Sequence, residues 1–199
     1  MENVRILKDT TSNPAPLGLA GFGLTTMLLN IHNAGFFELN TMIAAMGIFY
    51  GGLAQVIVGI MEWKKNNTFG TVAFTSYGLF WLTLVAIWFI PGGEKVEKTS
   101  AAGMATYLAL WGIFTVFLFV ATFKINRALQ IVFGLVVLLF LLLTLAYATH
   151  SNPQLSHVFH TLAGFEGIVC GAAALYTGMA QVINEYYGKI VLPIDKKRS

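Results

Sequence analysis

Six long apolar segments constrain the fold of this chain more than any other feature of its sequence. They cover roughly residues 15–33, 41–62, 70–90, 101–123, 128–149 and 156–183. About 20 consecutive apolar residues in a helix are enough to cross the hydrocarbon core of a bilayer. With 56% hydrophobic and 11% charged residues, the chain is also far more apolar than an average soluble domain. The sequence therefore predicts an all-α integral membrane protein with six transmembrane helices in one bundle.

Little sequence lies outside these segments. We expect a head over residues 1–12, a six-helix transmembrane domain over 13–183 and a basic tail over 184–199. Because no soluble domain fits into the remaining residues, any function must reside within the membrane region. We expect no enzymatic activity, no cofactor and no bound metal.

The basic residues predict the orientation. An even number of spans places both ends of the chain on one side, and the opposite side receives only Lys95 and Lys98. The side of the termini collects Arg5, Lys8, Lys64, Lys65, Lys124, Arg127, Lys189, Lys196, Lys197 and Arg198. Short basic loops stay in the cytoplasm, so both termini are expected there. This charge is a topology signal, and we expect the lipid bilayer rather than a nucleic acid as the partner.

The first span begins with "NPAPLGLAGFG", residues 13–23. Asparagine is a favoured helix cap and proline is tolerated in the first turn, so Asn13 and Pro14 predict the helix start. Small residues then follow, and the second and sixth spans carry Gly47 with Gly51 and Gly167 with Gly171. Glycines four residues apart allow helices to approach closely. Tight helix packing and a narrow glycine-lined passage are both compatible with this pattern.

Uncharged polar residues recur inside the spans, among them Thr25, Asn30 and Gln55. Each can bond a neighbouring helix, or together they can form a polar path for a small solute. The segment "YGGLAQVI" in the second span also recurs as "YTGMAQVI" in the sixth, with six of eight positions identical. This is either the trace of an internal repeat, which is common in transporters, or chance.

Glu166 is the acidic residue that lies well inside a span. An ionisable group at membrane depth is costly and is by default a functional hypothesis, so Glu166 is a candidate proton carrier. His157 and His160 precede it with helical spacing, but no cysteine or carboxylate cluster accompanies them. A metal or haem site is therefore not favoured.

Four motifs resemble those of the acetate uptake transporter family, in particular its bacterial and archaeal succinate-acetate permeases. They are NPAPLGLAGFG at 13–23, MGIFYGGLAQ at 46–55, NTFGTVAFTSYGLFWLTLVAI at 67–87 and YLALWGIFT at 107–115. The resemblance extends over nearly the whole chain. It implies a homo-oligomer, expected to be a hexameric ring, in the inner (plasma) membrane of a prokaryote. Each protomer would pass acetate, and in some members succinate or other short carboxylates, by a proton-linked or channel-like route.

The resemblance also implies which residues form the path. An aromatic residue, a tyrosine and an aliphatic residue form the family's constriction, and these correspond to Phe22, Tyr77 and either Leu135 or Val136. The expected substrate-binding residues at the mouth and along the path are Asn13, Pro14, Ala15, Pro16, Leu17, Gly18, Thr25, Asn30 and Gln55. We expect the free amides at the start of the first helix to attract a carboxylate.

Two alternatives of different classes remain at the level of sequence. One is an ammonium or ammonia exporter, which would need an acidic or aromatic vestibule supplied by Glu38, Glu94 or Glu97. The other is a non-transporting membrane signalling or scaffold protein, for which the basic tail is the sole support.

Overall fold

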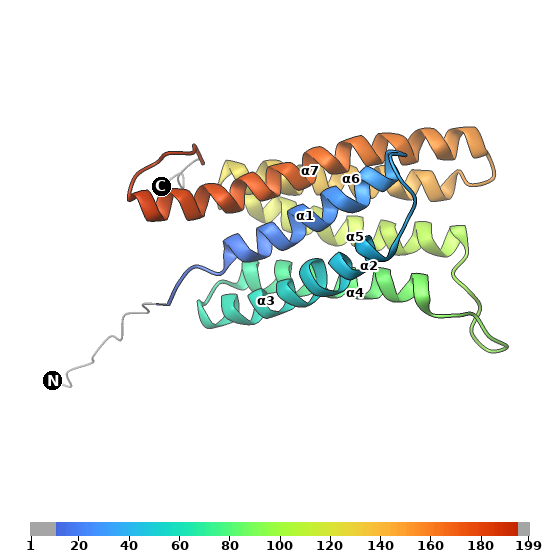
Figure 1. The fold of residues 1–199 in the computed structure, drawn as a ribbon, viewed down its shortest axis with the longest axis horizontal. Helices are drawn as coiled ribbons and strands as arrows, with labels where there is room; N and C mark the ends of the chain where they lie inside the picture. Colours follow the sequence, from blue (N-terminus) through green and yellow to red (C-terminus); the bar gives the residue numbers. More distant parts are fainter. Residues whose placement is uncertain (1–10, 195–199) are drawn as a thin grey trace.

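The computed structural model describes residues 11–194, which form a bundle of long helices (Figure 1). The elements are α1 (Ala15–Asn33), α2 (Thr41–Met46), the π-helix η1 (Gly47–Ala54), α3 (Gln55–Lys64), α4 (Thr68–Phe89), α5 (Ala101–Thr122), α6 (Arg127–Ala148) and α7 (Pro153–Tyr187). The elements α2, η1 and α3 follow one another without a break and form one span. Within residues 11–194 there is no strand, so the prediction of an all-α fold is confirmed.

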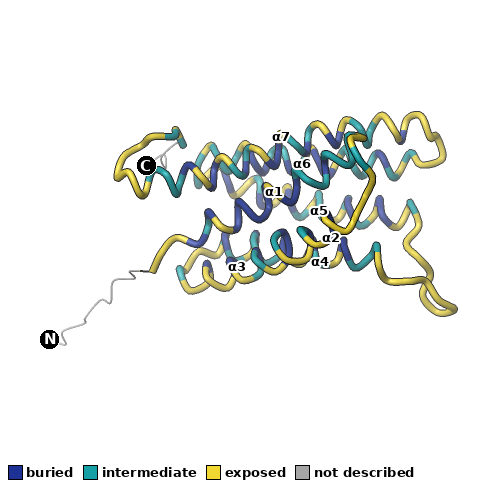
Figure 2. The backbone as a smooth tube through the Cα atoms, in the orientation of Figure 1, coloured by how far each residue is buried: buried dark blue, intermediate teal, exposed yellow. Residues whose placement is uncertain are grey.

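The predicted spans coincide closely with the observed helices. Five helices are long and apolar enough to cross a membrane, namely 41–64, α4, α5, α6 and α7. The shorter α1 is not among the five, and its last turns carry the polar Asn30, His32 and Asn33. It nevertheless lies inside the bundle, where most of its length is buried (Figure 2). α7 continues to Tyr187, beyond the expected boundary at residue 183.

Polar caps begin five of the helical segments. In each case a side-chain oxygen accepts a backbone N–H of the first turn, which satisfies a donor that the helix leaves unpaired. The capping residues are Asn40 for α2, Asn67 for α4, Ser100 for α5, Asn126 for α6 and Asn152 for α7. The helices thus begin at the ends of the apolar segments because asparagine or serine precedes them.

The start of α1 differs from the prediction. The helix begins at Ala15, and its cap position is Pro14, which has no capping side chain. Asn13 lies one residue further out, and its Oδ1 accepts the N–H of Ala15 at 3.1 Å. Pro16, rather than Pro14, is the proline in the first turn of the helix.

The described ends of the chain lie at the same end of the bundle (Figure 1). By helix order, Lys64, Lys124 and Lys189 lie at that end, whereas Lys95 and Lys98 lie in the loop at the opposite end. The predicted basic residues in 1–10 and 195–199 fall outside the described residues. Which end faces the cytoplasm stays a prediction.

Glycines allow α1 to contact its neighbours backbone to backbone. A Cβ atom on Gly23 would lie 2.6 Å from the carbonyl oxygen of Gly171, and one on Gly171 would lie 2.5 Å from the carbonyl oxygen of Gly23. A Cβ atom on Gly21 would lie 2.7 Å from the carbonyl oxygen of Tyr50. These distances exclude a side chain, so the tight-packing interpretation of the glycines is confirmed. α1 is thereby held between α7 and η1.

Candidate functional site

Two cavities lie along the bundle and share part of their walls. The near cavity, at the end where α1 begins, has a volume of about 340 Å³, and Asn13 and Gln181 lie in its wall. The far cavity has a volume of about 110 Å³ and reaches His32 and Tyr147 at the other end. Phe22 and Val136 line both cavities. These two side chains therefore mark the place where the cavities meet.

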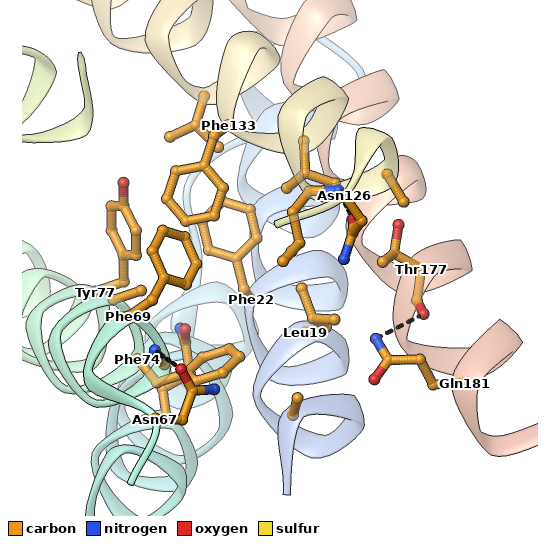
Figure 3. Close-up of a pocket in the computed structure, with 18 of the residues that line it drawn as sticks. Leu19, Phe22, Asn67, Phe69, Phe74, Tyr77, Asn126, Phe133, Thr177 and Gln181 are labelled. Carbon is orange, nitrogen blue, oxygen red and sulfur yellow. Dashed lines mark hydrogen bonds between the residues drawn. The ribbon is translucent and has the colours of Figure 1, made fainter. Parts of the chain in front are cut away.

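Aromatic rings surround this meeting point. The ring centroids of Phe22 and Tyr77 lie 5.8 Å apart, and those of Tyr77 and Phe133 lie 6.0 Å apart. Phe69 packs on Phe133 with a centroid distance of 5.2 Å. Figure 3 shows these rings gathered beside the near cavity. The structure thus brings the predicted Phe22 and Tyr77 together and adds Phe69 and Phe133, which the sequence analysis did not identify.

The two candidates for the aliphatic constriction residue, Leu135 and Val136, lie in different surroundings. Val136 is buried and lines both cavities, whereas Leu135 is absent from the described walls of either one. Consecutive residues of a helix point about 100° apart, so only one of the two can face the passage. Val136, rather than Leu135, thus lies with Phe22 where the two cavities meet.

The hydroxyl group of Tyr77 is engaged away from the cavity. It lies 2.9 Å from Oγ1 of Thr115, which itself donates to the carbonyl oxygen of Trp111 at 2.7 Å. Because a threonine hydroxyl has a single proton, Tyr77 is the donor to Thr115. The ring of Tyr77, rather than its hydroxyl proton, is what remains for contact with a solute.

Asparagines surround the mouth of the near cavity. Asn13, Asn67 and Asn126 precede or cap α1, α4 and α6, and all three line the cavity (Figure 3 labels the last two). The Nδ2 group of Asn13 donates to Oε1 of Gln181 at 2.9 Å. The side chains that line the near cavity at its mouth are therefore polar but uncharged, which suits a solute that sheds only part of its water.

Glu62 supports this mouth and was missed by the sequence analysis. It lies at the end of α3 and is 2% exposed, and its Oε2 accepts a hydrogen bond of 2.7 Å from Nδ2 of Asn67. Its other oxygen accepts no hydrogen bond within the described part of the chain. The nearby Asn67 was the only local signal, because a glutamate beside Lys64 and Lys65 otherwise resembles an exposed interfacial residue.

The start of α1 is the predicted site for a carboxylate. The N–H of Ala15 is bonded to Asn13, and those of Leu17 and Gly18 point at the carbonyl oxygen of Pro14 at 3.1 and 3.4 Å. Pro16 has no amide hydrogen. Within residues 11–194 the first-turn amides of α1 are therefore bonded inside the chain, and a carboxylate site at this helix start stays a prediction.

The remaining predicted path residues lie in different surroundings. Asn13, Ala15 and Gln55 line the near cavity, and Asn30 lines the far cavity. Pro14 lies in a surface hollow, Leu17 is exposed, and Pro16 and Gly18 are buried. Thr25 is fully buried and turns to the carbonyl oxygen of Met46 at 3.5 Å, so it acts in helix contact.

Glu166 lies near the middle of α7 and is partly buried. It is the fourteenth residue of α7, about 20 Å from the helix start at 1.5 Å per residue. Both carboxyl oxygens are buried and have no hydrogen-bond partner among the described residues. However, Glu166 belongs to neither described cavity wall.

Two histidines line the far cavity. His32 bonds through Nδ1 to the carbonyl oxygen of Phe37 at 2.8 Å, and His160 packs on Tyr147 with a ring distance of 5.1 Å. Over residues 11–194, no three His, Cys, Asp or Glu side chains are grouped so that they could hold a metal ion.

Comparison with known proteins gives consistent results. The GPR1/FUN34/yaaH family matches residues 2–194. The succinate-acetate/proton symporter SatP of Escherichia coli (strain K12) is 51% identical over 185 residues, which cover 93% of this chain and 96% of that protein. Acetate permease A of Emericella nidulans is 32% identical over 200 residues, covering 92% and 65% of the two chains. A solved structure of the bacterial acetate channel SatP has a TM-score of 0.88 and 49% identity, covering 94% of this chain and 100% of that one. The chain therefore belongs to the GPR1/FUN34/yaaH family.

Proposed function

We propose that this protein transports acetate and related short carboxylates across a membrane. The observation that carries the proposal is the pair of cavities that meet at Phe22 and Val136 inside a six-helix bundle. The similarity to a succinate-acetate symporter, an acetate permease and an acetate channel supports acetate as the substrate. The constriction is formed by Phe22, Tyr77 and Val136.

The chemistry of the path supports a small, weakly bound solute. The walls at the constriction are aromatic and aliphatic, whereas the near mouth carries carboxamide groups. A ligand with four heavy atoms gains at most about 6 kcal/mol at a ceiling of roughly 1.5 kcal/mol per atom. Binding of acetate is therefore weak at every point, which favours rapid passage.

The ammonium alternative is less well supported. Glu38, Glu94 and Glu97, the acidic residues that it would require, are absent from the described walls of both cavities. The scaffold alternative leaves the two cavities without a role. Labelled acetate and ammonium, offered separately to proteoliposomes that contain the purified protein, distinguish the three functions. We expect uptake of acetate above that of protein-free liposomes. Uptake of ammonium alone, or of neither solute, would contradict the proposal.

The carboxylate crosses together with a proton, and Glu166 is the proton carrier. This role is supported by the two carboxyl oxygens of Glu166, which are buried and have no hydrogen-bond partner among the described residues. A carboxyl group in this position is costly to keep charged, so proton exchange gives it a role. The protein acts in the inner membrane of a prokaryotic cell, and both of its termini lie in the cytoplasm.

The protein works as a homo-oligomer, which we expect to be a hexamer. Large apolar side chains are exposed on the bundle, including Phe49 on η1 and Phe117 on α5. Lipid or a second copy of the chain can cover them, and the family resemblance favours copies of the chain. Mass measurement in mild detergent and in nanodiscs should give six copies, and a monomer in both media would contradict the assembly.

A further inference from the structure

The segment that follows α7 turns back toward the bundle at the end where the near cavity lies. α7 ends at Tyr187, and Gly188 then reverses the chain with a φ of 61°, a left-handed conformation that glycine adopts without strain. The remaining described residues, 189–194, turn back toward the helices (Figure 1). At their end, Ile194 lines the near cavity. The segment after the last helix thus contributes to the wall of the proposed path.

Two side chains of α7 hold this segment in place. Oδ1 of Asn184 accepts the backbone N–H groups of Val191 and Leu192 at 2.7 and 2.9 Å. Its Nδ2 group donates to the carbonyl oxygen of Leu192 at 2.8 Å. The hydroxyl group of Tyr176 donates to the carbonyl oxygen of Pro193 at 3.1 Å. These four hydrogen bonds fix the backbone just before it reaches the cavity.

Most of the segment is exposed. Ile190 is 55% and Val191 is 44% exposed, whereas Ile194 is partly buried. A segment that buries little apolar surface opens locally at a small free-energy cost, so its position depends strongly on the hydrogen bonds that hold it. It can therefore leave the cavity wall without unfolding of the helices.

We propose that residues 188–194 form a lid over the near cavity that limits the entry of carboxylates from that end. The tip of the lid is Ile194, which adds an apolar side chain to a mouth that asparagines surround. An apolar group in the mouth takes water from a charged solute and offers no hydrogen bond in return, which makes entry costly while the lid is closed. This inference rests on the proposed function and adds a point of control outside the constriction.

The test measures how fast a cysteine in the near cavity reacts with a neutral maleimide. Ala128→Cys places a thiol in the cavity wall, in the first turn of α6. The native Cys170 is the only cysteine of the chain and is buried, so the protein without an added cysteine gives the background. Ser151→Cys, in the exposed turn between α6 and α7, places a thiol outside the described walls of both cavities. Nanodiscs give the reagent access to both ends of the protein.

Two substitutions release the lid for different physical reasons. Asn184→Ala removes three hydrogen bonds, and Gly188→Val introduces a β-branched residue that resists a positive φ. Gly188→Asn is the matched control, because asparagine tolerates this conformation and a Cβ atom there would meet no described atom within 4 Å. Each release variant should raise the labelling rate of the Ala128→Cys protein about tenfold or more. Gly188→Asn should leave that rate unchanged.

The labelling outcomes decide whether the segment covers the cavity. An unchanged rate in a folded release variant would overturn the lid. An equal rise in the Ser151→Cys protein would indicate general loosening and would also contradict it. If Asn184→Ala does not fold, the comparison of Gly188→Val with Gly188→Asn decides alone.

Acetate uptake into proteoliposomes separates the lid from the proposed function. The release variants should take up acetate faster than the wild type and than Gly188→Asn. Faster labelling without faster uptake would overturn the claim that the lid limits entry. If the wild-type protein moves no acetate, the proposed function fails, and the labelling rates still decide whether the segment covers the cavity.

Discussion

Replacing Phe22 with alanine is expected to let larger carboxylates through the protein. The ring of Phe22 lines both cavities and packs on Tyr77 at 5.8 Å, so its removal joins the two cavities into a wider path. We expect the flux of a four-carbon acid such as butyrate to rise about tenfold or more, which corresponds to about 1.4 kcal/mol of barrier. The measurement is uptake of a chain-length series into proteoliposomes.

The controls separate widening from loss of structure. Truncating a buried phenylalanine commonly costs about 3–5 kcal/mol of stability, so the variant must first elute as a folded oligomer. Phe22→Leu is a milder second variant, and Phe117→Ala removes an exposed ring outside the path. Tyr77→Phe keeps the ring and loses only the hydrogen bond to Thr115, so it should transport the same range of carboxylates as the wild type. If a folded Phe22→Ala protein transports the same range of carboxylates as the wild type, Phe22 is not part of the constriction.

Replacing Glu166 with glutamine should abolish the proton influx that we propose to accompany acetate. The amide keeps the size of the side chain but cannot exchange a proton, and both oxygens of the native carboxyl group are buried without a partner in the described structure. The pH dependence of acetate uptake should become flatter. Simultaneous recording of labelled acetate and of a pH-sensitive dye inside the proteoliposomes measures both quantities.

Glu185→Gln is the matched control for this experiment, because Glu185 is an exposed carboxylate on the same helix. It should leave both acetate flux and proton influx as in the wild type. Coupling that persists in a folded Glu166→Gln protein would exclude Glu166 from the mechanism. The pH dependence would then come from the ionisation of acetate itself.

The helices were predictable because length and apolarity are strong signals in a membrane protein. Asn67 and Asn126 also mark helix starts in the sequence, since a capping side chain acts through its nearest amides. The π-helix η1 was not predictable in this way. Its residues 47–54 have the composition of an ordinary apolar helix, and its geometry depends on the neighbours that it contacts.

Which residues of α6 face the interior of the bundle was also not predictable from the sequence. Lipid is as apolar as the interior of a helix bundle, so a helix such as "IVFGLVVLLFLLLTL" carries no periodic signal for its buried side. Only the packed structure distinguishes Val136 from Leu135.

We propose that acetate crosses between the near and far cavities at Phe22, Tyr77 and Val136. The most direct test is acetate flux through Val136→Trp, in which a large ring should fill the meeting point of the two cavities. Flux should be measured at alkaline pH, where little neutral acetic acid is present to cross the lipid, and compared with wild-type and protein-free liposomes. We expect the folded variant to fall to the protein-free level. Wild-type acetate flux in that variant would contradict the claim.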